Sequence, residues 1–321
     1  MFGKLKKAAR VTLMTCLEVQ PHERLLIVAD DDSPEKVVQA LYDEARSMGI
    51  EVAMLQITPR QFNGEELPDF VARLLKQVDV YLGPTSKSFS HTDARRDASK
   101  SGVRGATLPG VNEDIFKRLM AVDYQAIAAK AKVLVERITR AKSVRITSEN
   151  GTDLVLGLGN TFEPDDGMLS AAGAFGNLPA GEVMGAPSGG KGTLVIDAMG
   201  DIITEPTTVV IGKGEIIDIQ PNKSGERFKD LLEKAARQDG NRNAFKVAEL
   251  GIGLNPLAKI SGEILEDEKV LGTIHVAFGD NSSYPGGKNT ASIHLDGVVL
   301  EPKLYFDDQG EEVIGELVGR D

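Results

Sequence analysis

The stretch Arg24-Leu-Leu-Ile-Val-Ala-Asp30 is an unbroken apolar run that ends in an acidic cluster. A run of this kind is typical of a strand that is buried on both faces, as in a parallel sheet covered by helices. Ser33 and Pro34 follow at once and predict the start of a helix, with Ser at the cap and Pro in the first turn. A buried strand followed directly by a helix predicts an α/β domain.

The same alternation continues on the C-terminal side of this stretch. Apolar periodicity predicts further strands at residues 51–57, 78–82 and 104–108, and helices at residues 69–77 and 123–140. This order is typical of an open, mostly parallel sheet with helices on both faces.

The pattern changes near residue 142. Short strands at residues 143–148 and 153–158 are joined through Asn150-Gly151, a strong hairpin signal. Strands then predominate, interrupted by a single predicted helix at residues 225–237. We therefore expect two domains, with an α/β domain at residues 1–142 and a β-rich, mostly antiparallel domain at residues 143–321.

Composition and charge limit the classes of function. The chain of 321 residues has a formal net charge of -11 and a pI near 5.0, which argues against nucleic acid as a partner, because binding phosphates requires a basic surface. The sequence contains no apolar run long enough to span a membrane. Cys16 is the only cysteine, which excludes an intrachain disulfide and a thiolate metal cage. We expect a cytoplasmic enzyme.

Two of the four histidines lie near the C-terminal end, His275 in Ile-His-Val-Ala-Phe and His294 in Ser-Ile-His-Leu-Asp. Successive side chains of a strand point to opposite faces, so His294 and Asp296 share one face. Two imidazoles and a carboxylate on neighbouring strands are a common way to bind a divalent metal. The alternative interpretation is that both histidines are hydrogen-bonded residues of the core.

Two glutamates lie in apolar surroundings, Glu182 in a loop between two prolines and Glu249 in an apolar strand. A charge in such surroundings is costly unless another group neutralises it. Each glutamate alone fits an edge charge or a salt-bridge partner. Together with His275, His294 and Asp296, they supply enough carboxylates and imidazoles for two divalent ions that share a bridging carboxylate or water.

A further stretch, Ser-Lys-Ser-Phe-Ser90-His91-Thr92-Asp-Ala-Arg95-Arg96, follows a predicted strand of the first domain. Ligands of open parallel sheets tend to bind at such places, so a binding role for His91 and the two arginines is one interpretation. The other is that Ser90 or Thr92 caps a helix and the arginines are solvated.

Four motifs in order resemble the aminopeptidase T and S family, the thermophilic leucyl aminopeptidases. They are Asn-Leu-Pro-Ala-Gly-Glu-Val, Ala-Glu-Leu-Gly-Ile-Gly, His-Val-Ala-Phe-Gly and Ser-Ile-His-Leu-Asp. The Ser-Phe-Ser-His-Thr-Asp-Ala-Arg stretch is similar to that family too, so the resemblance spans most of the chain. One departure precedes the first histidine of the motifs, where the family carries Leu-Phe-Asp-Glu-Asn-Ala and this chain has Glu266-Asp-Glu-Lys-Val-Leu.

The resemblance implies a dimeric, two-metal exopeptidase that removes residues from a peptide with a free N-terminus and whose second domain carries the metal site. Two divalent ions, zinc, cobalt or manganese, would activate a bridging water, with a glutamate relaying the proton and a tyrosine stabilising the oxyanion. The active-site tyrosine of the family would fall near Tyr284, and its metal ligands on Glu182, Glu249, His275, His294 and Asp296.

Two other functions stay open. A ring-cleaving dioxygenase of dihydroxypyridine looks like an offshoot of the same family, and its single Fe(II) would need only His275, His294 and Asp296. A non-catalytic, metal-dependent binding protein would bind the ion without turnover. The main prediction is a metal-dependent aminopeptidase, because Glu182 and Glu249 provide the extra carboxylates that two ions require.

Overall fold

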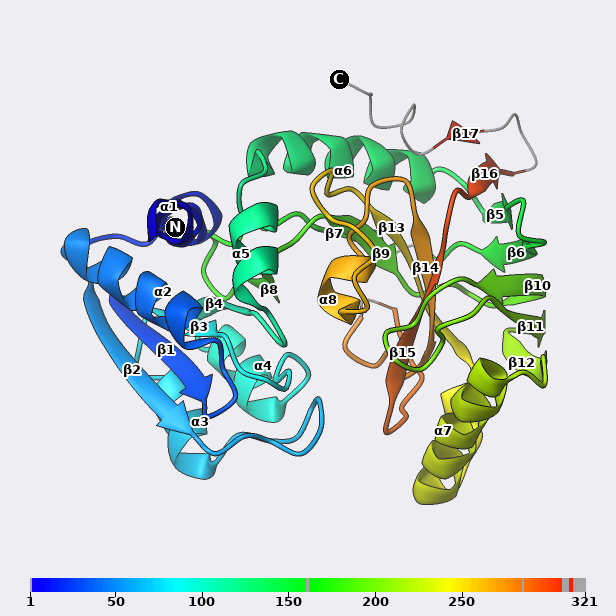
Figure 1. The fold of residues 1–321 in the computed structure, drawn as a ribbon, viewed down its shortest axis with the longest axis horizontal. Coiled ribbons are helices and arrows are strands. Elements are labelled where there is room, and N and C mark those ends of the chain that lie inside the picture. The colour runs from blue at the N-terminus through cyan, green and yellow to red at the C-terminus, as the bar shows by residue number, and fades with distance from the viewer. Residues whose placement is uncertain (1, 160–161, 285, 308–311, 314–321) are drawn as a thin grey trace. The chain divides into compact units, whose positions relative to one another are not determined.

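The computed structural model describes residues 2–159, 162–284, 286–307 and 312–313, and Figure 1 shows its helices and strands. The chain forms two compact units. Unit 1 comprises Met1–Ala126 with Asp165–Ala180, and unit 2 comprises Ile127–Pro164 with Gly181–Asp321. The predicted combination of an α/β and an α+β fold is confirmed, because unit 1 contains a parallel sheet and unit 2 contains antiparallel sheets.

Unit 1 is built around a five-stranded parallel sheet in the order β2-β1-β3-β4-β8. The apolar run of the sequence forms β1 in its interior, and every residue of β1 after the first is buried. β2 lies at the edge of the sheet and is largely exposed. The strands are β1 (Arg24–Asp30), β2 (Glu51–Ile57), β3 (Val80–Gly83), β4 (Arg104–Thr107) and β8 (Phe175–Asn177).

Helices lie on both faces of this sheet (Figure 1). On one face, apolar residues of α3 (Asp69–Leu75) and α4 (Asp93–Lys100) pack against buried side chains of β1 and β3. The other group consists of α1 (Phe2–Arg10), its π-helical continuation η1 (Val11–Cys16), α2 (Glu35–Ser47) and α5 (Glu113–Leu119).

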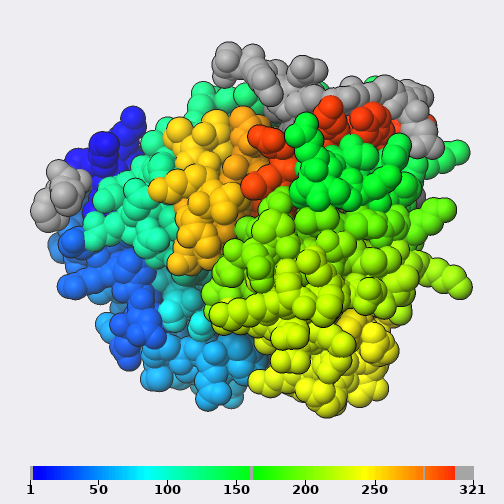
Figure 2. All heavy atoms as spheres, turned by 45° about the vertical axis from the view of Figure 1, so that its right-hand side comes forward, coloured from blue at the N-terminus to red at the C-terminus, as the bar shows by residue number. Residues whose placement is uncertain are grey.

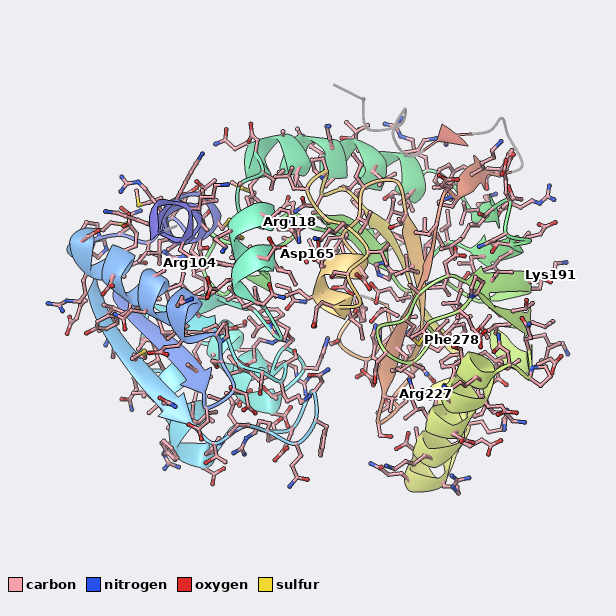
Figure 3. The ribbon with its side chains drawn as sticks, in the orientation of Figure 1. Arg104, Arg118, Asp165, Lys191, Arg227 and Phe278 are labelled. Atoms are coloured by element: carbon pink, nitrogen blue, oxygen red, sulfur yellow. The ribbon has the colours of Figure 1, made fainter. Side chains whose placement is uncertain are left out.

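An arginine in the sheet fixes the segment that leads into β1. The Arg104 guanidinium, labelled in Figure 3, donates to the Leu17 carbonyl at 2.9 Å and to Glu23 Oε1 at 2.7 Å. The hydrogen bond to Glu23 holds the pKa of that carboxyl below its usual range. The hydrogen bonds and the ion pair of Arg104 therefore hold the segment that precedes β1 in place.

Unit 2 contains two sheets. Sheet B has the order β12-β11-β10-β6-β5-β16-β17, and sheet C has the order β15-β14-β13-β9-β7. The strands of sheet B are β5 (Ser143–Thr147), β6 (Asp153–Gly157), β10 (Gly190–Ile196), β11 (Thr207–Gly212), β12 (Glu215–Ile219), β16 (Lys303–Phe306) and β17 (Glu312–Val313). Those of sheet C are β7 (Phe162–Asp165), β9 (Glu182–Gly185), β13 (Val247–Gly253), β14 (Ile274–Gly279) and β15 (His294–Val299). The predicted Asn150-Gly151 hairpin joins β5 to β6.

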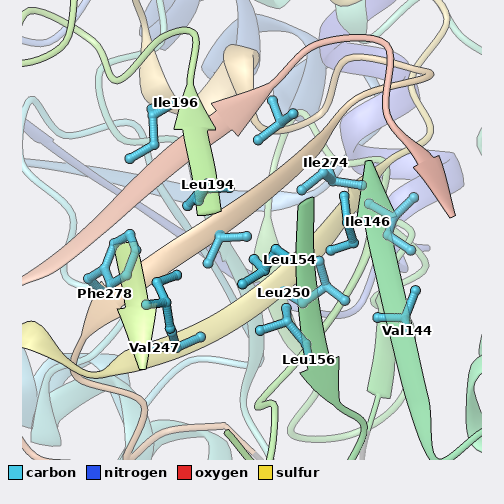
Figure 4. Close-up of a cluster of buried hydrophobic side chains, with 14 of the residues drawn as sticks. Val144, Ile146, Leu154, Leu156, Leu194, Ile196, Val247, Leu250, Ile274 and Phe278 are labelled. Carbon is cyan, nitrogen blue, oxygen red and sulfur yellow. The ribbon is translucent and has the colours of Figure 1, made fainter. Parts of the chain in front are cut away.

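The core of unit 2 contains the apolar faces of sheets B and C, and Figure 4 shows part of it. Strands of sheet B alternate buried and less buried residues, as strands with one face on a core do. Apolar residues of α6 (Tyr124–Thr139) and α7 (Lys223–Asp239) join the same core. The rings of Phe228 in α7 and Phe278 in β14 lie 5.8 Å apart. The shorter helices are η2 (Asn243–Phe245) and α8 (Ile264–Asp267).

The division of the chain differs from the boundary expected near residue 142. Ala131, Leu134 and Ile138 of α6 belong to the core of unit 2, so the unit begins at Ile127, within that helix. Residues 165–180 return to unit 1, where β8 pairs in parallel with β4. A three-residue strand with sequence Phe-Gly-Asn carries too little periodicity to be recognised from sequence.

The surface of unit 2 includes α7 and strands β10 to β12, which Figure 2 shows in green to yellow as one continuous region.

None of the helices in the described parts of the chain is both long and apolar enough to cross a membrane.

We predict that Leu154→Ala lowers the free energy of unfolding by about 3 kcal/mol, because it removes buried apolar surface and leaves a cavity. Leu154 in β6 is fully buried in the core of unit 2. Leu257→Ala is the matched control, since this leucine is 39% exposed and its loss should cost less than about 1 kcal/mol. Urea denaturation of both variants measures the difference, and equal losses would contradict the assigned core.

Candidate metal centre

The five predicted metal ligands lie on one face of sheet C. Residues directly opposed in antiparallel strands point to the same face, and so do alternate residues of one strand. The opposed pairs include Gly251 with His275 and Ala277 with Asp296. This register, extended through β9 and β15, places on one face Glu182, Glu249, His275, His294 and Asp296.

The other face of the same strands packs into the hydrophobic core. Leu250 and Ile252 of β13, together with Val276 and Phe278 of β14, alternate with the polar residues and are buried there. The core therefore fixes the backbone on which the polar groups stand. A site built on packed strands is more rigid than a site built on loops.

Gly251 makes room for His275. A Cβ atom at this position would lie 2.0 Å from the His275 Cε1 atom and 2.1 Å from Nε2. The imidazole therefore rests on the glycine backbone, in space that any side chain would fill. The backbone of β13 at Gly251 and the His275 imidazole of β14 are therefore in direct contact.

Side-chain atoms of the group converge on a small volume. Glu249, His275 and Asp296 each offer one ligand atom, and these atoms lie within 4.8 Å of one another. His294 Nε2 lies 3.0 Å from Glu249 Oε2 and 3.1 Å from Asp296 Oδ1. His275 Nε2 lies 3.4 Å from Glu249 Oε1 and 3.5 Å from Glu182 Oε2.

Two residues that are not among the predicted metal ligands orient the His294 side chain. Its Nδ1 donates to the carbonyl of Asp280 at 2.7 Å, so Nε2 faces the carboxylates. The Tyr284 ring stacks on the imidazole, with ring centroids 5.7 Å apart. A backbone carbonyl on one imidazole nitrogen is the usual arrangement by which a protein presents the other nitrogen to a metal.

The carboxylates make both imidazoles strongly basic. Burial opposes a charge on His275, but the hydrogen bond to Glu249 and the nearby carboxylates raise its pKa to about 10. Burial likewise acts against a charge on His294, yet Asp296 and Glu249 raise its pKa well above the usual value. Both are therefore imidazolium ions at neutral pH when no metal is bound. Since a ligand imidazole must be neutral, metal binding releases protons and strengthens as the pH rises.

The residues fit a divalent ion. The 3.0 Å contact between Glu249 Oε2 and His294 Nε2 lacks hydrogen-bond geometry, and the buried Oε2 has no hydrogen-bond partner among the described residues. Such a contact is expected of two ligands that point at one ion. Imidazole nitrogens with carboxylate oxygens suit zinc, iron and manganese.

Lys269 is a member of the group that sequence reasoning missed. Its side chain is fully buried, and its ammonium contacts Glu182 Oε1 and, at 2.7 Å, Glu268 Oε1. The signal for it was the departure from the aminopeptidase motif at Glu266-Asp-Glu-Lys-Val-Leu. The departure therefore places a lysine next to Glu182, one of the predicted metal ligands.

The Ser- and Thr-rich stretch lies in unit 1 and forms a helix start. Thr92 is the N-cap of α4 and accepts a hydrogen bond from the Arg95 backbone N–H. Arg96 is ion-paired with Asp93 at 2.8 Å, and the Arg95 guanidinium lies 4.3 Å from the ring centroid of Phe175. Cap chemistry therefore accounts for Thr92.

Comparison with known proteins gives the family. The family model described as 2,5-dihydroxypyridine 5,6-dioxygenase, NicX, matches residues 4–319. The chain belongs to this family. A comparison with curated protein sequences gave no match.

Two solved structures have a similar fold. The structure of 2,5-dihydroxypyridine dioxygenase from Pseudomonas putida KT2440 has a TM-score of 0.82 and 18% identity, and the match covers 98% of this chain and 96% of that one. Wild-type AmpT from Thermus thermophilus has a TM-score of 0.69 and 17% identity, with 97% of each chain covered.

These findings change the order of the functional predictions. The resemblance to aminopeptidase T is supported at the level of the fold, through AmpT. The family match and the higher TM-score both favour the dioxygenase alternative over the hydrolase. The chain is thus a member of an enzyme family with a candidate metal centre in sheet C.

We predict that Gly251→Ala weakens metal binding at least about tenfold, because the new methyl group displaces the His275 imidazole. Gly212→Ala is the control, since a Cβ there would lie 3.3 Å from the Ile217 Cδ1 atom, at the end of a side chain that is 67% exposed. Competition with a metal-binding dye measures both affinities. Unchanged affinity in the Gly251 variant would show that His275 is not a ligand.

Proposed function

We propose that the protein is a mononuclear Fe(II) dioxygenase that opens the ring of a hydroxylated pyridine of the dihydroxypyridine type. The observation that carries this proposal is the buried group of Glu249, His275 and Asp296 on sheet C, with His294 in contact with two of its members. The dioxygenase family model matches the chain from residue 4 to residue 319. Bound ferrous iron would supply the one-electron chemistry that dioxygen requires to react with an aromatic ring.

The proposed ligands are His275, His294 and Asp296. Two histidines and one carboxylate form the facial triad of non-haem iron oxygenases, which leaves positions open for substrate and oxygen. The compact group in the structure contains Glu249 in addition, in contact with both imidazoles. We assign Glu249 a role beside the metal, because the triad is complete without it.

Glu249 is placed to accept a proton from a substrate hydroxyl. Burial raises its pKa, and the two imidazolium charges more than offset this and hold the pKa below its usual range. A bound divalent ion would replace the two imidazolium charges with its own, so the Glu249 carboxylate stays ionised and able to accept a proton. Burial, together with the nearby Glu249 and Asp296 carboxylates, keeps the pKa of the Tyr284 phenol well above the usual value. The phenol therefore stays protonated beside the glutamate.

The two-metal aminopeptidase is the second candidate. It requires Glu182 as a ligand of the second ion. In the structure the Glu182 carboxylate is already ion-paired with the buried Lys269 ammonium. This contact supports one ion at the centre.

We predict that the wild-type protein, loaded anaerobically with Fe(II), consumes about one O2 per 2,5-dihydroxypyridine and incorporates both oxygen atoms into the ring-opened product. Oxygen electrode measurements and mass spectrometry with labelled dioxygen test this. Cleavage of an amino-acid anilide by the zinc, cobalt or manganese form, without oxygen consumption by the iron form, would support the aminopeptidase instead.

Variants separate the proposed ligands from the proposed base. His294→Ala and Asp296→Ala should each lower iron occupancy to a small fraction of the wild-type value, because the triad loses a donor. Glu249→Gln should retain the iron and reduce turnover by about 100-fold or more, because the proton acceptor is lost. Iron analysis and oxygen uptake are measured on the same samples. Loss of iron from the Glu249 variant would make Glu249 a ligand and reject the assigned role.

A further inference from the structure

Lys269 is a fully buried charged residue beside the candidate metal centre. Its side chain is 0% exposed, while Glu182 and Glu268, whose carboxylates it contacts, are 4% and 13% exposed. Lysine is rarely buried to this degree unless its charge is matched. Here one ammonium bridges two carboxylates, which is also what a divalent cation does in a two-metal site.

The backbone fixes the position of this lysine. It closely follows α8, and its N–H donates to the Glu266 carbonyl at 3.0 Å. Its own carbonyl accepts from the Asn255 N–H at 2.8 Å. The Glu266 side chain in turn accepts from the Lys259 N–H at 2.9 Å. These hydrogen bonds fix the backbone at Lys269, and the side chain extends from there to the two carboxylates of the centre.

We propose that Lys269 takes the place of a second divalent cation and so limits the centre to one metal ion. The inference rests on the proposed function for the metal at the first position. Glu182 links the two positions, because one of its oxygens contacts the Lys269 ammonium and the other lies 3.5 Å from His275 Nε2. A carboxylate shared in this way would bridge two ions if the ammonium were a metal.

Distances support the exchange of one cation for the other. The ammonium nitrogen lies 2.7 Å from Glu268 Oε1, whereas a divalent ion binds carboxylate oxygen at about 2.0–2.2 Å. A shift of about half an ångström by the Glu268 carboxylate, and a smaller one by Glu182, would therefore convert the ammonium position into a metal position. With the lysine present, a second ion would have to lie in contact with a positive charge at low dielectric, which is strongly unfavourable.

The formal charge around the two cation positions predicts how removal of Lys269 changes metal binding. Four carboxylates surround the two positions, those of Glu182, Glu249, Glu268 and Asp296. Without Lys269, one divalent ion leaves a formal charge of about -2 on these groups, and a second ion brings it to zero. A neutral, small residue at position 269 should therefore open a second metal site on Glu182 and Glu268.

The test counts metal ions. Wild type, Lys269→Ser and the control Lys246→Ser are loaded anaerobically with excess Mn(II), dialysed, and analysed by mass spectrometry for manganese and by electron paramagnetic resonance. Lys246 belongs to the same unit, and its ammonium donates to Asn243 Oδ1 outside the centre. We expect about one ion in the wild type and the control, and about two, magnetically coupled, in Lys269→Ser.

A double variant identifies the ligand of the second ion. Glu268→Gln/Lys269→Ser should return to about one ion, because the second position loses a carboxylate. One ion in Lys269→Ser, or two in the wild type at any manganese excess, would overturn the inference. The wild-type titration stays decisive even if Lys269→Ser folds only with manganese present. Oxygen uptake with dihydroxypyridine is scored separately, so a wild type with one ion but no uptake counts against the proposed function alone.

Discussion

The compensation of buried negative charge governs the candidate centre. Glu182, Glu249 and Asp296 lie on a face of sheet C where each is at most about a tenth exposed. Carboxylates in such surroundings are stable only when positive groups neutralise them. In the ion-free protein the positive groups are the two imidazoles and Lys269. A metal ion replaces the protons on the imidazoles, whereas Lys269 remains in contact with Glu182 and Glu268.

The packing of unit 2 makes this arrangement possible. Val276 and Phe278 in β14 are anchored in the core, so His275, which precedes them, has a fixed position on the opposite face. Gly251 provides the space beneath its ring. The polar face is thus a consequence of the same alternation that builds the core, and the ligands need few bonds of their own to be held in place.

Much of this arrangement was accessible from the sequence, because alternation within one strand fixes a shared face. His294 and Asp296 could be paired in this way, and the Asn150-Gly151 hairpin and the strand Arg24–Asp30 were also recognisable. Glu182 was expected in a loop and instead begins strand β9. Local periodicity does not determine the register between strands. The sequence alone therefore does not reveal that Gly251 makes room for His275, or that Lys269 contacts Glu182. The unit boundary illustrates the same limit, because β8 joins unit 1 by pairing with β4, about seventy residues away in sequence.

A shared fold does not separate a hydrolase from an oxygenase, since AmpT and the dihydroxypyridine dioxygenase both match nearly the whole chain. The difference has to lie in the site. A hydrolase with two ions uses a bridging carboxylate to hold a shared water, whereas an oxygenase needs open positions on a single ion. An ammonium is a cation that binds no water as a nucleophile and leaves no coordination position. In the proposed arrangement, the ammonium on Glu182 lowers the negative charge of the acidic face and occupies the position that a second ion would need for two-metal hydrolysis.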